Sequence, residues 1–247
     1  MIEKIEGIII SEKDYSETSK IINVLTKDRG IIGIMCKGAK TLKSPFRSVT
    51  GKLIYGYFNV YYKKDKLSTL ISVDIINNFK NIKKDIEKIS YASFLLELAE
   101  QVSKQSLHSG IYSLLIDGLI KIDEGFDPLV ITNIIELKYL DFLGVMPIID
   151  RCSSCGRTNS IATLSSSKGG YICNNCLTTE KIVNEKTIKL IRMFYYVDII
   201  KITKMNINNL SKLEINSFID EYYDRYTGLY LKSKSFINNL KKINIKE

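Results

Sequence analysis

Four cysteines in two closely spaced pairs constrain this chain more than any other feature. The pairs are Cys152-Ser-Ser-Cys155 and Cys173-Asn-Asn-Cys176, with 17 residues between them. A Cys-x-x-Cys turn directs two sulfurs toward one point, and two such turns at this spacing are typical of a tetrahedral zinc site. Four thiolate ligands leave no coordination position for water or a substrate. The sequence therefore predicts one structural Zn²⁺ ion, bound by Cys152, Cys155, Cys173 and Cys176.

Two disulfides, or four free thiols, are the alternatives for these cysteines. Disulfides persist in oxidising compartments, whereas the first residues of the chain lack the basic end and apolar run of a signal peptide. The sequence also has no uninterrupted apolar stretch of about 18 residues, which a membrane-spanning helix needs. We therefore expect a cytoplasmic protein, and this location favours a metal site over disulfides.

The first 80 residues have the pattern of a β domain. Five runs rich in β-branched or aromatic residues are separated by short polar turns. The runs cover residues 7–10, 20–26, 31–36, 52–62 and 67–76. Five short strands in this order predict a small closed barrel, with an open sheet as the alternative. Cys36 falls within an apolar run, and we expect it to be a buried small hydrophobe.

The pattern becomes helical from about residue 81. Apolar residues recur at helical spacing, Asp127-Pro128 is typical of a helix start, and Gly144 marks a helix end. Further helices are expected over residues 184–200 and 214–231. The cysteine segment, at about 148–181, interrupts this helical region. We therefore predict an α+β multidomain chain, with a barrel over 1–80 and a helical domain over 81–247 that carries a four-cysteine zinc finger as an insertion.

A basic stretch without acidic residues lies in the predicted barrel. The chain has 36 Lys and Arg against 27 Asp and Glu, a net charge of +9, yet no Asp or Glu occurs from Arg29 to Lys64. Cations neutralise phosphates and release counterions, and the aromatic residues of the same stretch could stack on unpaired bases. The alternative is that the aromatics fill the core and the lysines are merely solvated. The predicted DNA contacts are Arg29, Lys37, Lys40, Lys43, Arg47 and Lys52.

The sequence shows no constellation of catalytic residues. His108 is the one histidine, and we expect it to be a surface or cap residue at a break between two helices. Residues 33–40 resemble a phosphate-binding loop, but Ala39 follows the second glycine where that motif requires Lys. We therefore expect a protein without enzymatic activity.

Several short segments, in this order, resemble the RecO family of bacterial recombination mediators. They are residues 7–10, 15–17, 25–30, 37–40 with Ser44, and 137–147 running into 152–156. The resemblance implies an N-terminal OB-fold and a helical C-terminal domain. It implies a role in DNA repair and homologous recombination, with binding to single- and double-stranded DNA and annealing of complementary single strands. It also implies two protein partners, RecR and the C-terminal tail of the single-stranded DNA-binding protein SSB. With them, such a protein helps to load RecA on SSB-coated DNA in the bacterial nucleoid.

A protein–protein adaptor with a zinc finger and little intrinsic affinity for DNA is the competing hypothesis. Residues 81–150 are compatible with it, because they carry 11 acidic and 6 basic side chains. A gel shift against single-stranded DNA at moderate salt would separate the two hypotheses.

Overall fold

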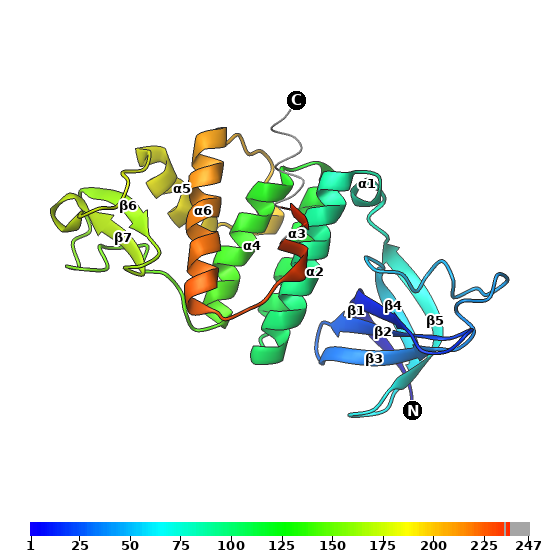
Figure 1. Ribbon diagram of the computed structural model, residues 1–247. Coiled ribbons are helices and arrows are strands. Elements are labelled where there is room, and N and C mark those ends of the chain that lie inside the picture. Colours follow the sequence, from blue (N-terminus) through cyan, green and yellow to red (C-terminus); the bar gives the residue numbers. More distant parts are fainter. Residues whose placement is uncertain (235, 238–247) are drawn as a thin grey trace. The chain divides into compact units, whose positions relative to one another are not determined.

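The fold is taken from a computed structural model that describes residues 1–234 and 236–237 (Figure 1). Five strands form the N-terminal part: β1 (Ile2–Asp14), β2 (Lys20–Thr26), β3 (Gly30–Cys36), β4 (Tyr55–Tyr61) and β5 (Ser68–Asn77). They close into a barrel in the order β1-β2-β3-β5-β4. This confirms the prediction of five strands and excludes the open sheet.

The length of β1 explains how the barrel closes. The first half of this 13-residue strand pairs with β4, from Ile2 opposite Tyr61 to Ile8 opposite Tyr55. The second half pairs with β2, and the register shifts between Ile9 and Ser11. All pairings are antiparallel except that of β3 with β5, which is parallel and covers two residue pairs.

Alternating side chains fill the barrel interior, as expected for strands with one buried face. Ile9, Ile22, Ile34 and Phe58 are fully buried there, and so is the thiol of Cys36, as predicted. Burial raises the pKa of Cys36 to about 12, which keeps this thiol protonated. The predicted fourth strand begins later than expected, because Leu53 adopts a left-handed backbone conformation with a φ of 62°.

Helices are the main regular element of the described residues after β5. They are α1 (Lys80–Lys83), α2 (Ile86–Gln105), α3 (Gly110–Glu124), α4 (Pro128–Phe142), α5 (Glu185–Tyr196) and α6 (Asn209–Tyr226). Asp127 caps α4 as predicted, since its side chain accepts hydrogen bonds from the backbone N–H groups of Leu129 and Val130. The helix α6 begins five residues before the predicted 214, because the side chain of Asn208 provides a cap by accepting a hydrogen bond from the backbone N–H of Ser211.

A β-hairpin stands between α4 and α5. It consists of β6 (Ile161–Ser165) and β7 (Gly170–Cys173), and a short 3-10 helix, η1 (Asn174–Cys176), follows it. A second 3-10 helix, η2 (Ile199–Lys201), follows α5. Within the described residues, no helix is both long and apolar enough to cross a membrane.

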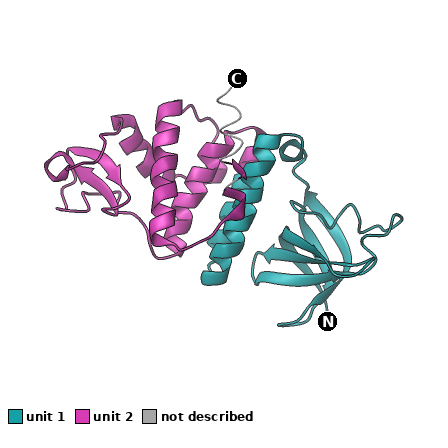
Figure 2. Cartoon of the chain, viewed as in Figure 1, with its two compact units in different colours: residues 1–119 teal, residues 120–247 magenta. Residues whose placement is uncertain are grey.

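Packing divides the chain into two compact units, residues 1–119 and 120–247 (Figure 2). The first unit contains the barrel, α1, α2 and most of α3. The second contains α4, the hairpin, α5 and α6. The predicted domain boundary after residue 80 is the point at which strands give way to helices. By packing, however, α2 and most of α3 belong to the same unit as the strands.

Candidate metal centre and nucleic-acid surface

The hairpin brings the four predicted metal ligands together. Cys152 and Cys155 lie in the segment before β6, Cys173 ends β7, and Cys176 ends η1. Their four sulfur atoms all lie within 4.8 Å of one another, although Cys155 and Cys173 are 18 positions apart in the sequence. The structure thus places in one cluster the ligands that the spacing predicted.

The donor set fits a tetrahedrally coordinated metal ion. The sulfurs of Cys155 and Cys173 are 3.6 Å apart. Four sulfurs at about 2.3 Å from a central Zn²⁺ are about 3.8 Å from one another. A disulfide requires about 2.05 Å, and all four cysteines are free. The geometry therefore favours a metal site over the disulfide alternative.

Backbone groups around the cluster favour the thiolate form of Cys152. Burial by itself raises the pKa of this thiol, but hydrogen bonds from the backbone N–H groups of Cys173, Cys155 and Ser154 outweigh burial and lower the pKa to about 6. The first of these donors lies 3.4 Å from the Cys152 sulfur. A metal ion binds the thiolate and not the thiol, so these hydrogen bonds favour the form of Cys152 that can act as a metal ligand.

The middle of the basic stretch, residues 37–54, forms the long connection between β3 and β4. Residues 37–54 contain turns and bends but no helix or strand. Ala39, Leu53 and Ile54 anchor this segment, because each is at most 3% exposed. Phe46 packs on the barrel core beneath it. The connection is therefore fixed to the barrel by its apolar residues.

Five of the six predicted DNA contacts lie on this connection, and all five residues are exposed at the surface. Within the described residues, no ion pair joins a carboxylate to Lys37, Lys43, Arg47 or Lys52. Lys40 differs, since its ammonium lies 2.8 Å from a carboxylate oxygen of Asp14. Four uncompensated cations thus occupy one surface segment.

Arg29 lies away from the other predicted contacts. It precedes β3 whereas Lys37 follows it, and a seven-residue strand spans about 23 Å. Its guanidinium pairs with Glu3 at 2.6 Å and stacks 4.5 Å from the ring centroid of Tyr62. The structure therefore does not place Arg29 with the cations of the β3–β4 connection.

Most aromatic side chains of the basic stretch are already in contact with the protein. Phe58 is in the core, the hydroxyl of Tyr55 donates to Glu6 at 2.8 Å, and the ammonium of Lys4 lies over Tyr57. Tyr61 is 52% exposed, and its ring is available for a ligand.

His108 takes the role predicted for it. It lies between α2 and α3, and its Nδ1 accepts a hydrogen bond from the backbone N–H of Gly110 at 3.0 Å. This contact satisfies a donor at the start of α3.

Comparisons with known proteins extend over nearly the whole chain. Residues 1–79 match the family described as recombination protein O N terminal, and residues 83–235 match recombination protein O C terminal. The chain is 34% identical over 245 residues to the DNA repair protein RecO of Listeria monocytogenes serotype 4b, across 98% of this chain and 96% of the relative. It is 32% identical over 244 residues to the DNA repair protein RecO of Bacillus subtilis strain 168, across 97% of this chain and 95% of the relative.

Proposed function

The chain belongs to the RecO family of DNA repair proteins, and from this premise we propose that it is a non-enzymatic mediator of DNA repair and homologous recombination. It binds single- and double-stranded DNA and anneals complementary single strands. With RecR it helps to load RecA on DNA coated by SSB, and it contacts SSB through the C-terminal tail of that protein. Its location is the cytoplasm, in association with the nucleoid.

One observation carries this proposal: four of the five cations of the β3–β4 connection are exposed and form no ion pair with a carboxylate of the described residues. Lys37, Lys43, Arg47 and Lys52 belong to a segment without acidic residues, which its apolar residues fix to the barrel. Annealing needs no bond chemistry. It requires cations that screen the repulsion between two strands while the bases stay free to pair, and phosphate contacts without base readout meet this need.

The strand order supports an OB-fold. A five-stranded barrel in which β1 pairs with both β2 and β4, and β3 meets β5, has the connectivity of that fold. OB-folds bind single-stranded nucleic acids on cationic surfaces with aromatic side chains. Tyr61 is the exposed aromatic residue of the basic stretch that is available for such stacking.

The four-cysteine cluster holds one Zn²⁺ in this proposal. Cys152, Cys155, Cys173 and Cys176 supply all four ligands, and the bound ion stabilises the hairpin without taking part in a reaction. A zinc-cross-linked hairpin also suits a protein from a reducing compartment, where disulfides do not persist.

An annealing assay tests the function. Complementary single strands are mixed with the protein without ATP or added Mg²⁺, and pairing is followed by fluorescence quenching, on bare and on SSB-coated DNA. A variant with Lys37, Lys43 and Arg47 changed to Glu should lose annealing. The matched control changes Lys181, Lys186 and Lys204 to Glu, which alters the net charge equally at exposed sites in residues 120–247.

Two outcomes decide between the hypotheses. Loss of annealing in the first variant and its retention in the control support the proposed surface. Equal annealing by both variants would refute it. If the wild-type protein binds no single-stranded DNA at moderate salt, the adaptor hypothesis replaces the mediator hypothesis.

A further inference from the structure

Lys168 lies in the turn that joins β6 to β7, between the two cysteine pairs in the sequence. The strand that follows this turn begins in close contact with Ile148, because a Cβ atom on Gly170, the first residue of β7, would lie 2.1 Å from the carbonyl oxygen of Ile148. Gly170 also has a φ of 150°, which side-chain-bearing residues rarely adopt. The hydroxyl of Ser165 accepts a hydrogen bond from the backbone N–H of Lys168 at 3.3 Å. The backbone of Lys168 is therefore held in place.

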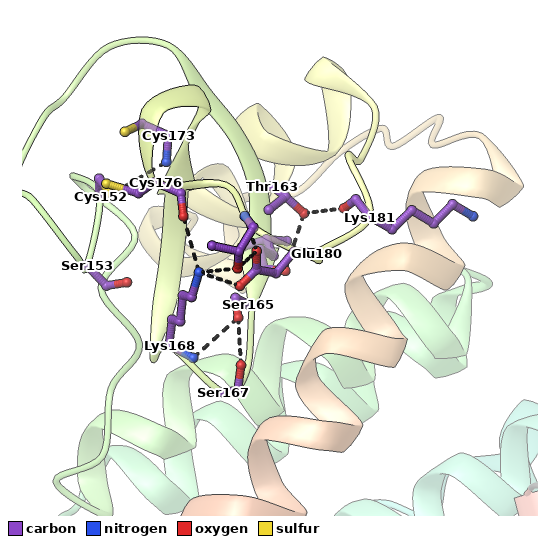
Figure 3. Close-up of polar contacts among 12 residues, drawn as sticks. Cys152, Ser153, Thr163, Ser165, Ser167, Lys168, Cys173, Cys176, Glu180 and Lys181 are labelled. Atoms are coloured by element: carbon purple, nitrogen blue, oxygen red, sulfur yellow. Dashed lines mark hydrogen bonds and ion pairs between the residues drawn. The ribbon is translucent and has the colours of Figure 1, made fainter.

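The side chain of Lys168 reaches the segment that follows the second cysteine pair (Figure 3). Its ammonium donates to the carbonyl oxygen of Cys176 at 3.1 Å and to the hydroxyl of Thr178 at 2.9 Å. It also forms an ion pair with Glu180 at 2.7 Å. Three contacts from one ammonium match the three N–H groups that a lysine can donate.

Glu180 completes this cluster from the other side. Its carboxylate accepts from the backbone N–H of Thr178 at 2.9 Å and from the Thr178 hydroxyl at 3.0 Å. The side chain of Glu180 is 13% exposed and that of Lys168 is 29% exposed, so the pair is partly shielded from water. The hydrogen bond from Lys168 is the main reason that the pKa of Glu180 falls to about 2, and the carboxylate therefore stays charged at neutral pH.

We propose that Lys168 is the positioning residue of the metal centre: it holds the Cys173–Cys176 turn in the conformation that directs both sulfurs at the ion. This inference rests on the proposed zinc site. Cys173 is fixed because it belongs to β7, whereas Cys176 ends a single turn of 3-10 helix and depends on what holds the chain after it. Lys168 supplies that contact directly at the Cys176 carbonyl. A divalent ion with four thiolates carries a charge of −2, which a nearby ammonium also stabilises.

Metal affinity of the full-length protein tests the proposal. The Lys168→Met variant keeps the aliphatic stem but removes the charge and the donors, and Lys168→Arg keeps both. The control is Lys181→Met, because Lys181 is an exposed lysine of the same region (Figure 3). Zinc affinity is measured by competition with a chromogenic chelator, and Co²⁺ titration reports tetrahedral thiolate coordination through its absorption bands.

Loss of an outer-shell contact typically lowers metal affinity about 10- to 100-fold. We expect a loss in that range for Lys168→Met, recovery of most of it in Lys168→Arg, and wild-type affinity for Lys181→Met. Equal affinities for the two methionine variants would overturn the role of Lys168 and leave the zinc site intact. A wild-type protein that binds neither Zn²⁺ nor Co²⁺ would overturn the zinc site itself. If Lys168→Met does not fold, Glu180→Gln disrupts the same cluster, and unchanged affinity in that variant would also overturn the proposal.

Discussion

Tyr112 in α3 donates a hydrogen bond to the carboxylate of Glu6 in β1, with 3.1 Å between the two oxygens. Tyr55 in β4 donates to the same carboxylate oxygen at 2.8 Å. One acidic side chain therefore joins a helix and two strands within residues 1–119, across 106 positions of sequence. These contacts give the barrel a specific connection to α3.

Removing the Tyr112 hydroxyl should destabilise the first unit. Tyr112 is 5% exposed, so Tyr112→Phe keeps the packing of the ring while Glu6 loses one of its two tyrosine donors. A hydrogen bond to a charged group is worth about 1.5–3 kcal/mol. Because Tyr55 remains bonded to Glu6, we expect a loss of about 1–2 kcal/mol in the free energy of unfolding, measured with urea.

Tyr57→Phe is the control for this measurement. The ammonium of Lys4 lies over the Tyr57 ring. Within the described residues, no hydrogen bond joins the Tyr57 hydroxyl to another protein group. Its removal should change the free energy of unfolding by at most about 0.5 kcal/mol. If Tyr112→Phe and Tyr57→Phe lower the free energy of unfolding by similar amounts, the hydrogen bond from Tyr112 to Glu6 makes no specific contribution to stability.

Seven buried or half-buried tyrosines predict a loss of stability at alkaline pH. The pKa is raised, mainly by burial, for all seven: Tyr55, Tyr112, Tyr139, Tyr171, Tyr195, Tyr222 and Tyr223. For Tyr55 it rises from 10.0 to about 12. Between these values the unfolded chain has released a proton that the folded chain retains, so the free energy of unfolding falls as pH rises.

Urea unfolding at pH 9, 10 and 11 measures this effect. Stability should fall between pH 10 and 11, and Tyr55→Phe should show a smaller fall than the wild-type protein because one of the titrating groups is missing. A pH dependence identical in the two proteins would contradict the assignment of a raised pKa to Tyr55.

Removal of one metal ligand should abolish zinc binding. We expect elemental analysis to find one zinc per chain in the wild-type protein prepared without chelators, and none in Cys173→Ser. Structural zinc sites contribute about 10–16 kcal/mol of apparent binding free energy in small peptides. Here the hairpin should lose its order, measured as faster protease cleavage within residues 148–181, while the helical circular dichroism largely persists.

Cys36→Ala is the matched control for zinc content. Cys36 is fully buried in the barrel and is not part of the four-cysteine cluster, so this variant should retain one zinc per chain. Wild-type protein without zinc would contradict the metal assignment, and so would loss of zinc in Cys36→Ala.

The sequence predicted those features whose signals are local. Cys-x-x-Cys turns specify their own geometry, and β-branched runs between polar turns specify strands, so the cysteine cluster and the five strands could both be anticipated. Contacts between distant residues could not. Nothing near Arg29 indicates that Glu3, 26 positions earlier, neutralises it, and the turn around Lys168 gives no sign that its ammonium binds the carbonyl of Cys176.

Helix boundaries were predicted less well for a related reason. The first turns of α6 contain Leu210 and Leu213, both 55% exposed, and exposed apolar residues obscure the periodicity that identifies a helix. The cap at Asn208 is a local signal, but the chain has several asparagines in this region and periodicity does not select one of them.

The salt dependence of DNA binding should report the cations of the β3–β4 connection directly. For single strands, the slope of log K against log salt concentration is about −0.7 for each phosphate neutralised. Changing Lys37, Lys43 and Arg47 to Gln should therefore make the slope less steep by about 2 if all three contact phosphates. Binding of a labelled oligonucleotide is measured by fluorescence anisotropy at several salt concentrations. In contrast, Arg29→Gln should leave the slope nearly unchanged, because its guanidinium is already paired with Glu3. If the triple variant keeps the steep slope of the wild-type protein, or if changing Arg29 alone makes the slope shallow, then DNA binds at a surface other than this connection.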